Sequence, residues 1–345
     1  RSGGVGMTET IGGKVARAGL QSVAGRLGGR AIDFATLLVL AQLLVPADFG
    51  LIALAMTVIL LVEAVTDLPI NQPILRAEDP TPDDYDTAFT LGLLRALVLA
   101  GVVAAVAGPV AAFYKEPRLP ILILALATAP MLRSLVSPRM ADFTRAYNMW
   151  PDFILTLSGK AASFAVVATL AVTTQSYWAI AAGTITTPLV GNVLSYWLAP
   201  YRPRLGLRRW HAFKDIMGWS SLGQFFSALN FQIDRMLLGR TLPAADLGRY
   251  ALASDLTGVA MQGILVPFSG PLTVALAQAG KAEDLRRAWD KTLNATVCIM
   301  GPVLLAISVM TAPIVGLLLG PSWSDLSPIL SWLALTTIPA IVGPI

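Results

Sequence analysis

Long apolar stretches alternate with short polar segments along the whole chain. Each stretch holds about 20 predominantly apolar residues, the number that an α-helix needs to cross the roughly 30 Å hydrocarbon layer of a bilayer. The period-two alternation of outer-membrane barrels is absent from the sequence. The pattern therefore predicts ten membrane-spanning helices, near residues 17–44, 48–69, 87–113, 119–138, 151–173, 176–199, 214–238, 248–272, 287–318 and 324–345.

Composition agrees with a membrane protein and excludes a cytosolic enzyme. Hydrophobic residues make up 55% of the chain and charged residues only 13%, whereas about a quarter of an ordinary soluble domain is charged. One cysteine, Cys298, and one histidine, His211, cannot build a disulfide framework or an ordinary zinc, iron–sulfur or haem site. We therefore expect no metal and no cofactor.

Searches for catalytic and nucleotide-binding motifs point away from enzymatic activity. The chain has no G-x-x-x-x-G-K-[ST], H-E-x-x-H or G-x-S-x-G pattern. We expect no enzyme activity and no catalytic residue. Transport by this chain would then draw on an ion gradient, the membrane potential or the gradient of its cargo, and the sequence does not choose among them.

The distribution of lysine and arginine predicts the orientation in the membrane. If the N-terminus is cytoplasmic, 17 of these residues fall in inward-facing segments and 5 in outward-facing ones, as the positive-inside rule requires. This bias explains the net charge of +4 without a nucleic-acid partner. The most basic loop, residues 200–214, is interpreted as a topology determinant, and binding of anionic lipid or a cytoplasmic partner is the alternative.

An internal repeat is the most informative feature. Leu40–Ala55 reads LAQLLVPADFGLIALA and Leu238–Ala253 reads LGRTLPAADLGRYALA, with eight identities in sixteen positions at an offset of 198. Both copies fall at the turn between the first two helices of a half, and the shared Asp48 and Asp246 are predicted to cap the helices that follow.

The offset of 198 residues spans six predicted helices, an even number, so the repeats are parallel. We therefore predict an all-α integral membrane protein of two six-helix bundles, of which the second is incomplete in this chain. Residues 1–6 precede the first methionine and are interpreted as a cloning or upstream remnant, 7–205 as the N-terminal lobe and 206–345 as a truncated C-terminal lobe.

A family resemblance follows from Leu38–Arg76, LVLAQLLVPADFGLIALAMTVILLVEAVTDLPINQPILR. This run resembles the amino-terminal signature of bacterial polysaccharide flippases, in the superfamily of multidrug, oligosaccharidyl-lipid and polysaccharide exporters. The resemblance implies alternating access around a central cavity. The implied cargo is an undecaprenyl-pyrophosphate-linked oligosaccharide, moved across the bacterial inner membrane for surface polysaccharide assembly, with membrane lipids and other polysaccharide assembly proteins as further partners.

Ionisable side chains inside apolar spans are costly, and are therefore candidates for function. Arg26, Arg30 and Asp33 follow one face of the first predicted helix. They are interpreted as a wall that receives the pyrophosphate, with Asp33 orienting Arg30 or acting as a proton-linked group. A structural Arg–Asp pair, with Arg26 reaching the headgroups, is the alternative. Gly25 and Gly29 nearby predict a close helix contact.

Other polar residues complete the candidate site. Lys160 lies near mid-depth in the fifth predicted helix without an acidic neighbour within a turn, so it needs a partner on another helix or water. Arg95 is a further cavity cation or a residue that merely reaches the headgroups. Glu63 and Asp67 are either a coupling site or part of a solvated vestibule. The remaining candidates for the cavity or for coupling are Asn230, Asp234, Arg235 and Asp255.

Two alternative functions remain at this point. A multidrug or cation antiporter of the same superfamily would require an acidic cavity, and the basic face of the first helix argues mildly against it. A membrane-embedded glycan polymerase or acyltransferase would require a large external loop, whereas the outward loops are predicted to be short. A fragment without transport activity is also compatible with a truncated second lobe.

Overall fold

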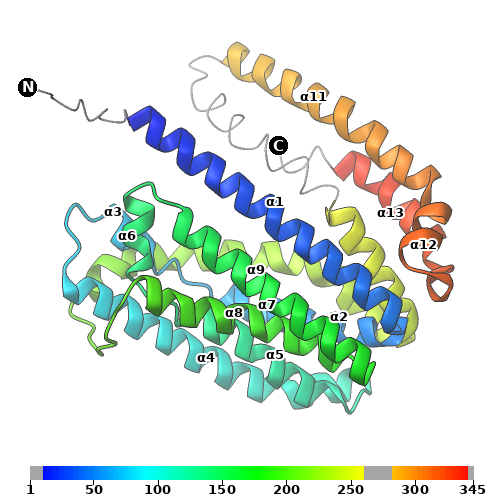
Figure 1. The fold of residues 1–345 in the computed structure, drawn as a ribbon, viewed down its shortest axis with the longest axis horizontal. Helices are drawn as coiled ribbons and strands as arrows, with labels where there is room; N and C mark the ends of the chain where they lie inside the picture. The colour runs from blue at the N-terminus through cyan, green and yellow to red at the C-terminus, as the bar shows by residue number, and fades with distance from the viewer. Residues whose placement is uncertain (1–10, 260–281, 341–345) are drawn as a thin grey trace, which may run out of the picture. The chain divides into compact units, whose positions relative to one another are not determined.

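A computed structural model describes residues 11–259 and 282–340, and this part of the chain is helical without strands (Figure 1). The helices are α1 (Ile11–Leu43), α2 (Pro46–Thr66), α3 (Gln72–Arg76), α4 (Pro82–Tyr114), α5 (Leu119–Ser134), α6 (Met140–Arg145), α7 (Trp150–Thr174), α8 (Trp178–Leu198), α9 (Trp210–Thr241), a helix over 244–259, α11 (Ala282–Val309), α12 (Thr311–Leu318), the 3-10 helix η1 (Pro321–Trp323) and α13 (Leu326–Ala340).

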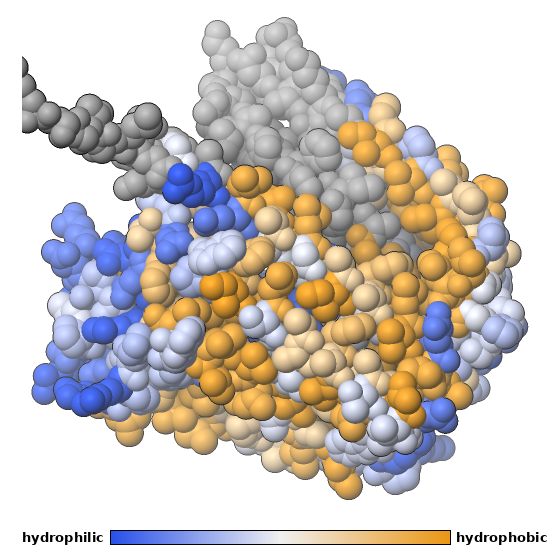
Figure 2. Space-filling model, in the orientation of Figure 1, coloured by the Kyte–Doolittle hydropathy of each residue, from blue (hydrophilic) through white to orange (hydrophobic). Residues whose placement is uncertain are grey.

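The apolar stretches of the sequence correspond to these helices, which confirms the all-α class. By length and composition, α2, α4 and α7 could each cross a membrane, and α11 with α12 could form a fourth span. The total of ten spans stays a prediction, and residues 260–272 of the eighth stretch lie outside the described residues. Figure 2 shows apolar side chains over the middle of the visible face, with polar ones gathered where α3 and α6 lie.

The ninth apolar stretch differs from the expected single helix. It is broken at Met310, where α11 and α12 meet at a bend of 69°. The break lies three residues before Pro313, which is the third residue of α12. Proline lacks a backbone N–H, so it is tolerated in the first turn of a new helix but disfavoured inside a continuous one.

The described chain forms two compact units. Of the described residues, unit 1 contains 11–36, 54–174 and 178–240, and within it α7 packs along α8, α4 along α5, and α5 along α8. Unit 2 contains the described residues 37–53, 175–177, 241–259 and 282–340. The turn between α1 and α2 therefore belongs to unit 2. The lobe boundary near residue 205 stays a prediction.

Unit 2 holds the α1–α2 turn through contacts with the turn after α12. Trp323 is fully buried, and its indole N–H donates to the Ala41 carbonyl at 2.6 Å. Its ring also meets Phe49 edge-on, with 5.1 Å between centroids. The Gln42 amide donates to the Leu318 carbonyl at 3.2 Å. A buried indole needs such an acceptor, so this contact fixes the position of η1.

The two copies of the repeat pack against each other inside unit 2. A Cβ added at Gly50 would lie 1.9 Å from the Ala244 carbonyl oxygen, and one added at Gly248 would lie 1.8 Å from the Pro46 carbonyl oxygen. Gly50 and Gly248 are 198 residues apart, and so are Pro46 and Ala244. The contact is therefore reciprocal, which supports the internal repeat, while two complete bundles stay a prediction.

The repeated aspartates do not cap the helices as predicted. The helices begin two residues earlier, at Pro46 and at residue 244, so Asp48 and Asp246 are the third residues of their helices. A carboxylate in the first turn still interacts favourably with the positive end of the helix dipole. Both backbones turn alike, because the Asp48 N–H donates to Val45 and the Asp246 N–H donates to Pro243.

Candidate functional site

A close contact between α1 and α7 positions the first group of polar residues in unit 1. A Cβ added at Gly25 would lie 3.2 Å from the Phe153 ring, and one at Gly29 would lie 3.3 Å from the Lys160 side chain. Small residues on α1 therefore let the two helices approach, as the spacing of Gly25 and Gly29 predicts. The start of α7 is also fixed, because the Met149 N–H donates to the Gln21 side chain at 3.2 Å.

Lys160 meets Asp33 across this contact. The Lys160 ammonium forms an ion pair with the Asp33 carboxylate, and it also lies 3.4 Å from the Gly29 carbonyl oxygen. The Lys160 side chain is 24% exposed and that of Asp33 is 47% exposed. The acidic partner that Lys160 lacks within its own helix therefore comes from α1.

Arg26 and Arg30 continue the polar face of α1 beyond Asp33, and both are exposed. The charge of Arg26 acts on Asp152 in the first turn of α7. Charged groups thus follow the line along which α1 and α7 meet, from the start of α7 to Lys160. We call this line, formed by Arg26, Arg30, Asp33, Asp152 and Lys160, the charged seam.

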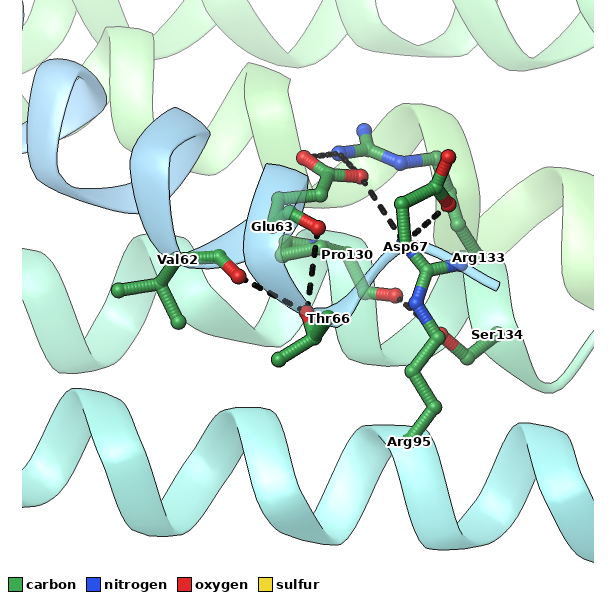
Figure 3. A network of polar contacts seen from close by, with 8 residues as sticks. All are labelled: Val62, Glu63, Thr66, Asp67, Arg95, Pro130, Arg133 and Ser134. Carbon is green, nitrogen blue, oxygen red and sulfur yellow. Dashed lines mark hydrogen bonds and ion pairs between the residues drawn. The ribbon is translucent and has the colours of Figure 1, made fainter. Parts of the chain in front are cut away.

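A second group of charges joins α2, α4 and α5 (Figure 3). Asp67, just after the end of α2, pairs with Arg95 at 2.9 Å, and Glu63 lies 3.9 Å from the same guanidinium. One terminal nitrogen of Arg133 donates to both carboxylate oxygens of Glu63 at 3.0 Å. Arg95 is only 12% exposed. We call these four residues the inner network.

Two cavities border the inner network. One, of about 330 Å³, is lined by Asp67, Arg95, Arg133 and the α5–α6 turn. The other, of about 290 Å³, is lined by Glu63, Asp67 and one face of α9 that includes Gln224. Asp67 therefore lines both cavities, and Glu63 lines the second. The Arg95 Nε is buried without a hydrogen-bond partner among the described residues.

This geometry corrects one interpretation of the sequence. Arg95 does not reach for the headgroups, because it is the 14th residue of α4 and binds Asp67. Glu63 and Asp67 are each paired with an arginine and line a cavity, and the choice between a coupling site and a solvated vestibule stays a prediction. The sequence analysis did not single out Arg133, which the structure pairs with Glu63. The available signal was its place in the last turn of an apolar helix.

The remaining candidate residues are dispersed. On α9, Asn230 is exposed, whereas Asp234 and Arg235 are partly buried. Gln232 of the same helix accepts a hydrogen bond from Thr57 of α2 at 3.2 Å. Asp255 belongs to unit 2. Within the described ranges, no group of three or more His, Cys, Asp or Glu side chains could hold a metal ion.

Replacing Arg95 with methionine is expected to destabilise unit 1. Methionine keeps the apolar stem but leaves Asp67 and Glu63 without this cation. Breaking a fully buried pair costs about 3–5 kcal/mol, and the partial exposure of Asp67 reduces the expected loss to about 2 kcal/mol. The measurement is thermal unfolding of purified protein in detergent. Adding Asp67→Asn should recover part of the loss.

Arg118→Met supplies the matched control. Arg118 binds Glu116 at 2.8 Å in the α4–α5 loop and is 51% exposed. Its hydrogen bond holds the pKa of Glu116 below the ordinary value. Exposed pairs contribute about 0–1 kcal/mol, so this variant should unfold close to the wild-type temperature. Equal shifts for Arg95→Met and Arg118→Met would contradict a special role for the inner network.

Comparison with known proteins agrees with the resemblance seen in the sequence. The family model described as polysaccharide biosynthesis protein matches residues 39–328. The succinoglycan biosynthesis transport protein ExoT of Rhizobium meliloti (strain 1021) is 22% identical over 334 residues, which cover 96% of this chain and 68% of ExoT. The lipopolysaccharide biosynthesis protein WzxC of Escherichia coli (strain K12) is 24% identical over 316 residues, which cover 88% of this chain and 63% of WzxC.

The chain thus spans about two thirds of the length of both relatives. No solved structure matches it. Both relatives are named for polysaccharide biosynthesis, and ExoT is named as a transport protein. The resemblance to the polysaccharide flippase branch is therefore confirmed.

Proposed function

Because the chain belongs to the polysaccharide biosynthesis protein family, we propose that it is a flippase for an undecaprenyl-pyrophosphate-linked oligosaccharide. It acts by alternating access in the bacterial inner membrane, with a cytoplasmic N-terminus. The cargo serves surface polysaccharide assembly, where membrane lipids and other assembly proteins are further partners. The names of both relatives and the apolar helices support this proposal.

The charged seam is the observation that carries the proposal. Lys160 lies about 15 Å along α7 from its first residue, deep enough that an unpaired cation would be costly. Asp33 and Asp152 supply two negative charges along the seam against three positive ones from Arg26, Arg30 and Lys160. The arginines and the lysine of the seam are groups that suit an anionic cargo. Arginine binds phosphate oxygens in pairs and lysine acts as a compact point charge, so a pyrophosphate matches the seam.

The inner network supports the flippase over a cation antiporter. An antiporter needs carboxylates that are open to a proton, sodium or a cationic drug. Here Arg133 binds both oxygens of Glu63, and Asp67 is paired with Arg95. We therefore assign Glu63 and Asp67 to holding α2, α4 and α5 together, and any role in coupling would begin with the release of these pairs.

Short connections support a transporter over a glycan polymerase or acyltransferase. The α4–α5 connection comprises residues 115–118, and the α7–α8 connection comprises residues 175–177. Both lie on the side that the positive-inside rule assigns to the exterior. Neither has the length of a catalytic external loop.

Complementation tests the proposal. The complete gene product is expressed in a bacterial strain that lacks its own polysaccharide flippase, and surface polysaccharide is measured for the wild type and for Arg30→Ala. We expect rescue by the wild type and a partial or complete loss with Arg30→Ala, because the arginine would bind the pyrophosphate. Arg118→Ala, the same change in an exposed loop, should rescue fully. Full rescue by each of the two single variants, Arg30→Ala and Lys160→Ala, would exclude the charged seam as the cargo site.

A further inference from the structure

The connection between α8 and α9, residues 199–209, is held in place by polar contacts with α4. The Tyr201 hydroxyl donates to the Asp86 carboxylate at 2.6 Å, and Arg209 donates to Asp84 at 3.0 Å. Burial, together with the bond to Asp86, raises the pKa of Tyr201, so its hydroxyl stays a donor at neutral pH. The connection therefore presents its side chains from a fixed backbone.

A cavity of about 440 Å³ lies beside this connection and carries unpaired positive charge. The Arg139 guanidinium lies over the Tyr85 ring at 5.7 Å. Arg202 and Arg204 form no ion pair with any residue that the structure describes. Three arginines thus face one carboxylate. The lining consists of Pro82, Tyr85, Asp86, Arg139, Tyr196, Pro200, Tyr201, Arg202 and Arg204.

The other two arginines of the connection are paired with carboxylates. Arg208 lies 3.7 Å from Asp83 and Arg209 lies 3.0 Å from Asp84. These two paired arginines do not line the cavity, whereas Arg202 and Arg204 do. Arginines that line one cavity and form no ion pair are suited to bind phosphate oxygens.

Exposed apolar side chains adjoin this cavity in the chain. Trp197, next to Tyr196, is 76% exposed, and Leu205, next to Arg204, is 73% exposed. Tryptophan is enriched where a membrane protein meets the headgroup region, and basic pockets between helices at the cytoplasmic face bind anionic lipid headgroups. A water-soluble phosphate would gain nothing from these apolar groups, whereas an acyl chain would cover them.

We propose that this cavity, which we call the linker pocket, binds the phosphate headgroup of an anionic glycerophospholipid of the surrounding membrane. Arg202, Arg204 and Arg139 contact the phosphate, and Trp197 and Leu205 contact the acyl chains. The site is separate from the charged seam, and it holds a resident lipid and not the transported one. It does not depend on the identity of the cargo.

Binding of phosphatidylglycerol to the purified full chain in detergent, followed by native mass spectrometry, tests the linker pocket. Each charge near an anionic headgroup contributes about 1 kcal/mol, so Arg202→Gln and Arg204→Gln should each weaken binding about fivefold, and the double variant about thirtyfold. Arg208→Gln, which removes the same charge from the same connection, should change binding less than twofold. Phosphatidylcholine should bind weakly to all of them.

Two further arms identify the source of the phosphate. Glycerol 3-phosphate and inorganic phosphate should bind far more weakly than phosphatidylglycerol, and Leu205→Ser should weaken only the lipid. Tight binding of either soluble anion would overturn the lipid assignment. Equal losses of phosphatidylglycerol affinity for Arg202→Gln and Arg208→Gln would also overturn it, because they would show only unspecific attraction between charges. If an arginine variant fails to fold, as thermal unfolding will show, Leu205→Ser decides: unchanged lipid binding would overturn the proposal.

Discussion

Replacing Gly248 with alanine is expected to destabilise unit 2 strongly, although the change adds only one methyl group. The added Cβ would lie 1.8 Å from the Pro46 carbonyl oxygen and 2.8 Å from the Gly50 nitrogen. Both are backbone atoms, so no side chain can rotate away and the helices themselves must separate. Overpacking of a well-packed core costs about 1–3 kcal/mol, and a contact this short should reach or exceed the upper end. Thermal unfolding and the yield of monodisperse protein in detergent measure the effect.

The reciprocal contact adds a second expectation. Gly50→Ala meets the Ala244 carbonyl at 1.9 Å, so it should cost about as much as Gly248→Ala. Gly301→Ala in α11 is the control, because its Cβ would have no neighbour within 4 Å, and the gain in helix propensity is up to about 1 kcal/mol. Normal unfolding temperatures for both Gly50→Ala and Gly248→Ala would contradict the close approach of the two repeat copies.

Replacing Lys160 with alanine is expected to abolish most transport under the proposed function. The variant loses a cation of the charged seam, and a hydrogen bond to a charged group contributes about 1.5–3 kcal/mol. We therefore expect transport to fall about 10- to 100-fold, measured as surface polysaccharide in the complementation assay at matched levels of inserted protein. Lys115→Ala, an exposed lysine in the α4–α5 loop, should retain activity.

A variant that combines Lys160→Ala with Asp33→Ala tests whether Lys160 binds the cargo or only neutralises the Asp33 charge. If Lys160 only compensates the Asp33 charge, Asp33→Ala should restore transport in the Lys160→Ala background. If Lys160 meets the pyrophosphate, the double variant stays defective, which is the expected result. Restoration to the wild-type level would refute the role of Lys160 in cargo binding and leave a structural pair.

The helices were largely predictable because hydropathy is a local property. Runs of apolar residues located α2, α4, α5, α7 and α8 to within a few residues. The break between α11 and α12 was not predictable in the same way, because an apolar run reads alike whether a helix is straight or bent by 69°.

For the candidate site too, residue types were readable from the sequence and their partners were not. The sequence singled out Asp33, Lys160 and Arg95 because ionisable groups are rare in apolar spans. It did not show which carboxylate each cation meets, and it did not single out Arg133. Those pairings join helices that lie far apart in the chain, so they depend on how the helices are rotated and packed.

By itself, then, the sequence determined the membrane-helix class, the repeated A-D-x-G turn and the resemblance to polysaccharide flippases. Each of these depends on residue types and their spacing along one chain. Only the tertiary structure decided that Gly50 and Gly248 meet, and that Lys160 is paired with Asp33. Contacts of this kind arise when helices pack within a few ångströms, where a single methyl group or a single charge changes the free energy, and no local pattern in the sequence encodes that approach.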